Sequence, residues 1–267
     1  MENQKLPEAE ESKLESTEAA LAQEIVVEEE LPAGVVVKEE VSSWKPKTAL
    51  GKLVKEGKIT SIDYILDKGL KILEFQIVDF LLPELEIDYI AVGQSKGKFG
   101  GGKRSIWRQT QKKTAEGNKP KFAALAIVGN KNGYIGIGYG KAKETVPARE
   151  KAIRKAKLNL IKIKRGCGSW ECNCKKPHSI PFAVTAKCSS VIIKLMPAPK
   201  GSNLTVEKEC AKLLSFVGIK DVYSRTFGQT RTKLNLIKAC IKALQKLSTT
   251  KTNSQEVTEL GIQEGLV

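Results

Sequence analysis

The stretch of sequence that decides the fold is residues 122–165, which read FAALAIVGNKNGYIGIGYGKAKETVPAREKAIRKAKLNLIKIKR. Apolar residues alternate on both sides of a turn-forming segment at residues 129–133, and such a pattern predicts a β-hairpin. After Gly140 the apolar spacing becomes helical, and Thr145 is suited to cap the helix. The stretch therefore predicts strand, turn, strand and helix.

The charge of the chain is strongly positive and unevenly distributed. The 267 residues carry a net charge of +15, yet residues 1–44 contain twelve Asp or Glu and three Lys. Residues 141–165 hold ten Lys or Arg against two Glu, and residues 93–121 hold nine against one. Two neighbouring segments of this charge predict a surface that meets nucleic-acid phosphates.

The second basic segment, residues 93–121, is expected to be a glycine-rich loop. Glycine lets the backbone approach phosphate closely, and Trp107 offers a ring on which a base can stack. The alternative is a flexible basic linker. The predicted RNA-binding residues are Lys96, Lys98, Lys103, Arg104, Trp107, Arg108, Lys141, Lys143 and Arg231.

The composition argues against membranes and for a reducing compartment. The apolar runs fall short of the roughly 18 residues that a spanning helix needs, and the first 21 residues are acidic and polar, unlike a signal peptide. Six cysteines without a secretory signal favour metal binding over disulfides. We therefore expect a cytoplasmic protein.

The segment GCGSWECNCKKPH at residues 166–178 has the pattern C-x4-C-x-C-x3-H. Thiolate and imidazole are preferred zinc ligands, and four of them close a tetrahedral structural site. We expect zinc here to fix the angle between the domains on either side, because the connector has little apolar packing besides Trp170. The alternative is reduced thiols and an ordinary loop histidine. The candidate ligands are Cys167, Cys172, Cys174 and His178.

Enzymatic readings of these motifs fail on their spacing. A catalytic zinc needs an open coordination position and a general base, for which only Glu171 is near, and the H-x-E with P-C-x-x-C pattern of zinc deaminases is absent. Residues 136–142, GIGYGKA, match neither a Walker A loop nor a dinucleotide-binding fingerprint. The sequence therefore favours a protein that is not an enzyme.

Four motifs resemble the signatures of one family. Residues 129–144, GNKNGYIGIGYGKAKE, resemble the hairpin-to-helix signature of the universal small-subunit ribosomal protein five family, in its archaeal type. Three further motifs are similar to the second-domain signatures of that family: PHSIPF at 177–182, LMPAPKG at 195–201 and GIKDVYSRTFGQT at 218–230. The resemblance spans residues 46–248, and residues 109–119 form an insert relative to bacterial members.

The resemblance implies an α+β fold and a structural role in the small ribosomal subunit. It implies binding of rRNA, a place along the channel through which mRNA enters, and a contribution to translation accuracy. The implied partners are rRNA, mRNA near that channel, and the neighbouring small-subunit ribosomal proteins three, four and eight. The alternative is a free regulator that binds double-stranded RNA, although such a regulator has no need of the second-domain motifs. A zinc enzyme is the remaining alternative.

Composition, periodicity and the resemblance together divide the chain. In the second domain we expect a helix that ends at Gly218 and a helix capped by Thr232, with Cys188, Cys210 and Cys240 as small core residues. The second helix should bury Leu234, Ile237, Ile241 and Leu244. The predicted segments are a disordered acidic arm (1–44), an N-terminal helical segment (45–84), a double-stranded-RNA-binding-like domain (85–165), the Cys/His connector (166–180), a C-terminal α/β domain (181–248) and a polar tail that frays (249–267).

Overall fold

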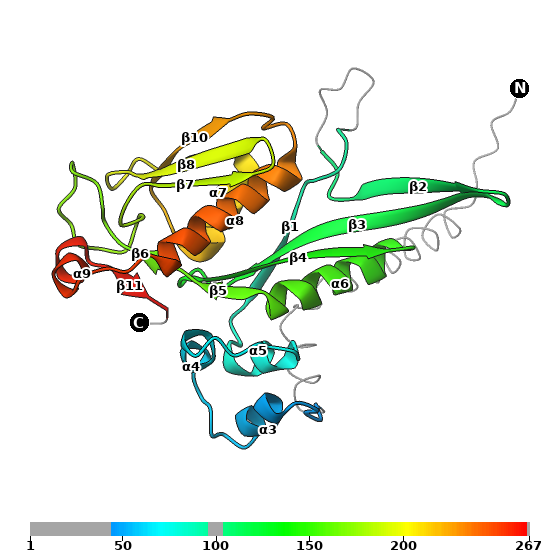
Figure 1. The fold of residues 1–267 in the computed structure, drawn as a ribbon, viewed down its shortest axis with the longest axis horizontal. Coiled ribbons are helices and arrows are strands. Elements are labelled where there is room, and N and C mark those ends of the chain that lie inside the picture. Colours follow the sequence, from blue (N-terminus) through cyan, green and yellow to red (C-terminus); the bar gives the residue numbers. More distant parts are fainter. Residues whose placement is uncertain (1–43, 96–103, 266–267) are drawn as a thin grey trace, which may run out of the picture. The chain divides into compact units, whose positions relative to one another are not determined.

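The first sheet is a five-stranded antiparallel sheet built around the predicted hairpin. The computed structural model describes residues 44–95 and 104–265, and its strands run in the order β1-β3-β4-β5 (Figure 1). Strand β2 pairs with the first half of β3, and β1 pairs with the second half. The pairing of β3 with β4 confirms the hairpin. The strands are β1 Glu86–Ile90, β2 Arg108–Thr114, β3 Gly117–Gly129, β4 Tyr134–Ala142 and β5 Leu160–Lys162.

The turn of the β3–β4 hairpin is held by an asparagine side chain. Asn130 Oδ1 accepts hydrogen bonds from the backbone N–H groups of Asn132 at 2.8 Å and Tyr134 at 3.2 Å. Gly133 has a φ of 95°, a conformation that side chains other than glycine rarely adopt. The turn sequence therefore fixes the register of the two strands.

Helix α6 (Thr145–Leu158) packs on β3 and β4 with backbone contact. A Cβ atom placed on Gly138 would overlap the backbone oxygen of Ala152, so only glycine lets the helix come this close. The same relation joins Gly136 to Ala156 and Gly140 to Ala148. We call these six residues the glycine–alanine seam. The helix starts where predicted, but its N-cap residue is Glu144, not Thr145.

The prediction that the basic segment at residues 93–121 is a single loop is wrong. Strand β2 and the start of β3 form a long hairpin with pairs running from Thr114–Gly117 to Arg108–Ala123. All residues in 108–113 and 117–121 are exposed on both faces, so no alternation of polarity marks these strands. The predicted RNA ligands Lys96, Lys98 and Lys103 lie outside the described residues.

The second domain confirms the predicted α/β pattern. Its four strands run in the order β7-β8-β10-β9, and two helices pack with them (Figure 1). Helix α7 ends at Gly218, which has a φ of 89°, and α8 follows Thr232, as predicted. The elements are β7 Val184–Cys188, β8 Val191–Pro197, β9 Leu204–Thr205, α7 Lys208–Val217, β10 Val222–Phe227 and α8 Lys233–Thr249.

The buried stripe of α8 is shifted from the predicted one. Leu234 and Ile241 lie half-buried at its edge, while Ile237 and Leu244 are fully buried. The stripe is completed by Leu236, Ala239, Cys240, Ala243 and Leu247. Cys210 is also buried, as predicted, whereas Cys188 is half-buried.

The two domains share one apolar core. Residues Pro46–Val267 form a single compact unit by their contacts, and Leu125 of β3 belongs to the same buried cluster as Leu213 of α7 and Leu244 of α8. The turn of the β3–β4 hairpin also caps α7. Lys131 N–H donates to the Phe216 oxygen at 3.0 Å, and Gly133 N–H donates to the Val217 oxygen at 2.9 Å. The shared core joins the two domains without a metal, so the reason for expecting zinc to fix their angle, a lack of apolar packing, does not hold.

Within residues 44–85 the structure has three short helices before the first sheet: α3 Ala49–Lys55, α4 Ile62–Asp67 and α5 Gln76–Leu81. Asp79 of α5 forms a buried ion pair with Lys157 of α6, with 2.6 Å between the charged atoms. The acidic arm at residues 1–43 lies outside the described residues. Among the helices that are described, none is both long and apolar enough to cross a bilayer.

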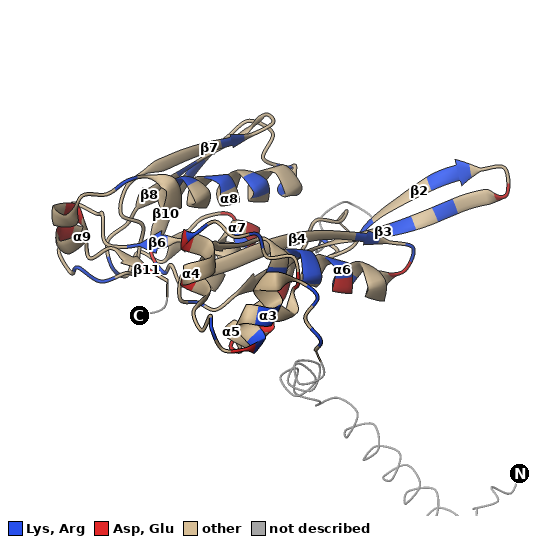
Figure 2. Cartoon of the chain, turned by 60° about the horizontal axis from the view of Figure 1, so that its bottom comes forward, with Lys and Arg blue, Asp and Glu red and all other residues tan. Residues whose placement is uncertain are grey.

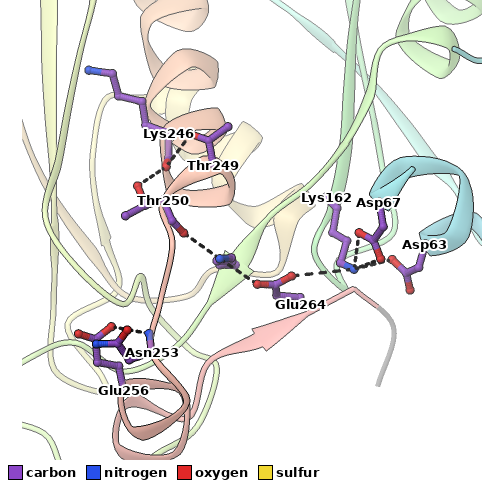
Figure 3. Close-up of polar contacts among 10 residues, drawn as sticks. Asp63, Asp67, Lys162, Lys246, Thr249, Thr250, Asn253, Glu256 and Glu264 are labelled. Carbon is purple, nitrogen blue, oxygen red and sulfur yellow. Dashed lines mark hydrogen bonds and ion pairs between the residues drawn. The ribbon is translucent and has the colours of Figure 1, made fainter. Parts of the chain in front are cut away.

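Residues 254–264 are folded, which corrects the prediction that the tail frays. Helix α9 (Ser254–Leu260) starts with a capping box formed by Asn253 and Glu256, and strand β11 (Gln263–Glu264) pairs with β6 (Lys164–Arg165). Glu264 contacts Lys164 at 3.0 Å and Lys162 at 4.0 Å, and Lys162 also pairs with Asp63 of α4 at 3.1 Å (Figure 3). Glu264 thus ties the end of the tail to charged partners, whereas most residues of α9 are exposed to solvent.

Candidate RNA interface and metal cluster

The β2–β3 hairpin carries most of its positive charge on one face. The strand register places Arg108, Ala123 and Lys141 opposite one another on β2, β3 and β4, so their side chains share one face of the sheet. Residues two positions apart on a strand also share a face. The exposed cations of this basic face are Arg108, Lys112, Lys119, Lys121 and Lys141. Figure 2 shows Lys and Arg running along the hairpin.

Three of the predicted RNA-binding residues meet at the base of the hairpin. Arg104, Trp107 and Arg108 line one open cavity of about 700 Å³. The guanidinium of Arg149 on α6 lies 4.8 Å from the ring centroid of Trp107 and 5.4 Å from that of Tyr89. A base stacked on Trp107 would therefore share the ring with Arg149. Arg149 is a residue that the sequence marked only as part of a basic helix.

The other described candidates are not brought to this cavity. Lys141 is exposed at the end of β4, and Lys143 is exposed just before α6, but neither lines the cavity wall. Arg231 is exposed in the second domain, on the loop between β10 and α8. The structure therefore joins Lys141 to the basic face by register and leaves Lys143 and Arg231 apart from it.

The Cys/His segment folds its four candidate ligands together. The sulfur atoms of Cys167, Cys172 and Cys174 and a ring nitrogen of His178 all lie within 4.8 Å of one another. Bonds of about 2.3 Å to sulfur and 2.0 Å to nitrogen would bring tetrahedral ligands to about 3.5–3.8 Å from each other, so a small contraction would close the set. Trp170, the large apolar side chain of this segment, is 92% exposed and adds no packing there.

The cluster has an outer partner that the sequence did not reveal. Asp221 Oδ2 lies 2.8 Å from His178 Nδ1, and Nε2 of the same ring lies 3.8 Å from the Cys172 sulfur. The other oxygen of Asp221 accepts from the backbone N–H groups of Gly201 and Asn203. A carboxylate on one ring nitrogen orients the other toward the thiols, as carboxylates do at metal-binding histidines.

The thiols of the cluster differ in acidity. Hydrogen bonds from the backbone of Lys200 and Cys174 lower the pKa of Cys172 to about 6. Burial, aided by the side chain of Cys174, raises the pKa of Cys167 to about 11. Cys172 therefore loses its proton more readily than Cys167 and is the better ligand for a cation at neutral pH.

A sheet domain with an exposed basic hairpin, joined through an apolar core to a second α/β domain, defines a structural RNA-binding protein. Comparison with known families gives the same class. Residues 106–164 match the family model for "Ribosomal protein S5, N-terminal domain", and residues 186–257 match that for "Ribosomal protein S5, C-terminal domain". The chain belongs to the ribosomal protein S5 family.

Similar proteins carry the name "Small ribosomal subunit protein uS5". The one from Nanoarchaeum equitans is 48% identical over 227 residues, covering 85% of this chain and 97% of its own length. The one from Methanocaldococcus jannaschii is 47% identical over 227 residues, covering 85% and 98%. The one from Staphylothermus marinus is 44% identical over 215 residues, covering 80% and 94%. The chain is thus a structural constituent of the small ribosomal subunit and not an enzyme.

Proposed function

We propose that the chain binds rRNA of the small subunit through the basic face and the cavity of Arg104, Trp107 and Arg108. The observation that carries this proposal is the strand register, which gathers exposed cations on one face of a hairpin. The acid at the hairpin tip, Glu116, pairs with Lys119 at 2.8 Å. Cations at fixed spacing neutralise phosphates and hold an RNA segment in register.

The finer role that we propose follows the family resemblance. In cytoplasmic ribosomes the chain lies along the channel through which mRNA enters, contacts small-subunit ribosomal proteins three, four and eight, and helps to set translation accuracy. Lys96, Lys98 and Lys103 extend the same basic segment in sequence, and Lys143 and Arg231 supply separate phosphate contacts. The rigid, shared core of both domains supports this role, because it keeps distant contacts at a constant separation.

Sedimentation of an extract that contains the tagged full chain tests this assignment. Comigration with small subunits is the expected result, and release from them by high salt follows from the electrostatic contacts. A free duplex-RNA regulator would stay in the light fractions instead. Binding of the purified chain to rRNA fragments should fall with salt at a log–log slope of about −0.7 to −0.9 for each phosphate contact. A flat salt response would contradict the proposed mechanism.

We also propose that Cys167, Cys172, Cys174 and His178 bind one structural zinc. Support comes from the convergence of four soft ligands and from the Asp221–His178 contact of 2.8 Å. Zinc would clip the loop between Cys167 and His178 onto the second domain, and it would supply no catalysis, because four ligands fill its tetrahedral shell. Elemental analysis of protein purified without chelators should find about one zinc per chain. Free titration of the three thiols without zinc would contradict the proposal.

A further inference from the structure

A second basic feature lies where the two domains meet. A cavity of about 670 Å³ is bounded by the turn of the β3–β4 hairpin, the end of the Cys/His connector and the residues that follow α7. We call it the interdomain pocket. The charged side chains in its wall are Lys131, Arg165, Lys176, Lys200, Lys220 and Asp221.

Arg165 distinguishes this pocket from a patch of surface lysines. Its side chain is buried, with the residue 6% exposed, and its Nη1 donates to the Lys131 backbone oxygen at 3.3 Å. Its Nε is buried and meets no acceptor, and no ion pair among residues 44–95 and 104–265 joins it to a carboxylate. Burial lowers its pKa, yet a guanidinium keeps its proton in proteins. A buried cation normally requires an anionic partner.

The acidic groups near the pocket are already engaged. One oxygen of Asp221 meets His178 at 2.8 Å, and the other accepts from Gly201 at 3.1 Å and Asn203 at 2.9 Å. The Phe216 and Val217 carbonyl oxygens at the end of α7 accept from the hairpin turn, so the negative helix end is capped. The field in the pocket is therefore positive.

The lysines around Arg165 differ in their own partners. Lys131 forms an ion pair with Glu86. Lys176, Lys200 and Lys220 are exposed and form no ion pair with any other residue that the structure describes. Three exposed cations thus surround one buried guanidinium. This arrangement resembles neither a salt-bridge network nor an evenly mixed surface.

We propose that the interdomain pocket binds phosphate groups. A guanidinium matches the planar pair of oxygens that phosphate offers, and ammonium groups add charge without strict geometry. The volume falls in the range of roughly 300–1,000 Å³ that holds small ligands, so the pocket has room for two linked phosphates. The source is either an rRNA backbone segment or a free phosphate-rich small molecule, and only the first depends on the proposed rRNA-binding function.

The test uses inorganic pyrophosphate as the probe and the purified full chain. Titration calorimetry at fixed ionic strength should show saturable binding. The double variant Lys176→Gln/Lys220→Gln should raise the Kd about tenfold, because charge-assisted hydrogen bonds are lost. The matched control Lys187→Gln/Lys194→Gln removes two exposed cations of β7 and β8, which do not line the pocket, and should change the Kd less than about twofold.

A third variant, Arg165→Gln, should abolish binding, a larger loss than that of the double variant, but it removes the Lys131 contact as well. The double variant is therefore decisive, with its melting curve as the check on folding. The proposal would be overturned if the unchanged chain showed no saturable binding of pyrophosphate. It would also be overturned if both double variants raised the Kd equally. Either failure would leave rRNA binding by the basic face intact, because different residues carry that function.

Assembled small subunits distinguish the two sources of phosphate. Acetylation with an amine-reactive ester reports whether Lys176 and Lys220 are covered. If rRNA fills the pocket, both lysines should be protected in the subunit, and pyrophosphate should not bind there. If the pocket instead takes a free ligand, both lysines should react in subunits dialysed free of small molecules, and added pyrophosphate should protect them. Both results support a phosphate site and assign its source.

Discussion

The two halves of strand β3 are both paired in the sheet, but they differ in burial and in residue type. Its first five residues, 117–121, are exposed and pair with the polar strand β2. Its last seven, 123–129, are buried between α6 and the second domain. One half of the strand therefore supplies stability, and the other supplies charge. Because stability and charge lie in separate halves of the strand, each property can be changed without the other.

The largest effect should come from the buried half, through Gly138 of the neighbouring strand β4, which pairs with Ala126 of β3. Gly138→Ala places a methyl group against the backbone of α6, and since a helix backbone cannot yield as a side chain can, the free energy of unfolding should fall by about 3 kcal/mol. Gln111→Ala, in the exposed strand β2, is the control and should change it by less than about 0.5 kcal/mol. Urea unfolding measures both. Equal stability of the two variants would show that the seam is looser than described.

The exposed half should affect RNA binding alone. Lys112→Gln/Lys121→Gln removes two cations of the basic face, so affinity for rRNA fragments should fall about tenfold and the salt slope should become shallower by about 1.4–1.8. Lys187→Gln/Lys194→Gln again serves as the charge-matched control. The melting temperature of both proteins should stay unchanged, as measured by circular dichroism. An equal loss with the control pair would mean that only net charge matters.

A smaller effect is expected from the metal cluster, which belongs to neither half of β3. Cys172→Ser should lower zinc content from about one per chain to near zero, while rRNA affinity drops less than about threefold because the basic face is untouched. Cys188→Ser, outside the cluster, should retain its zinc. Unfolding of the whole domain on loss of zinc would contradict the shared apolar core as the main support.

The smallest effect should follow removal of the acidic arm. Deleting residues 1–43, which spares the buried Trp44, removes nine net negative charges that should compete with phosphate for the basic face. Nonspecific RNA binding should strengthen by about twofold to threefold at low salt, with the melting temperature unchanged. Filter binding of both forms measures this. Weaker binding by the shortened chain would instead make the arm a contact element.

The contrast along β3 also explains which elements could be predicted. The buried half of β3 is a short apolar run, β4 alternates large residues with glycine, and turn-forming residues lie between them, so the hairpin can be predicted. Strand β2 reads RQTQKKT and is exposed on both faces, which leaves no periodicity to detect. The glycines of the glycine–alanine seam can be seen in the sequence. Their role cannot, because it depends on the close packing of α6 against them in the fold. Strand β11 was missed since its two residues are polar and pair with a distant strand.

The candidate sites follow the same logic. The four clustered ligands lie within twelve residues, so their convergence could be anticipated from the sequence alone. Asp221 could not, because it reaches His178 from 43 residues away. Arg165 looked like one basic residue among ten in its segment. Only the fold shows that it is buried beside Gly133 and Gly218, where both domains meet.

Because β6 pairs with β11, this two-stranded sheet can form only after the C-terminal residues have been synthesised. Lys162 gathers Asp63 from the N-terminal helices and Glu264 from the last strand, so one side chain joins residues made early and late. Until residue 264 leaves the synthesising ribosome, β6 keeps an unpaired edge, and open edges invite pairing with other chains. A chain whose synthesis stops a few residues before β11 would therefore have most of its fold but would expose the β6 edge to other chains.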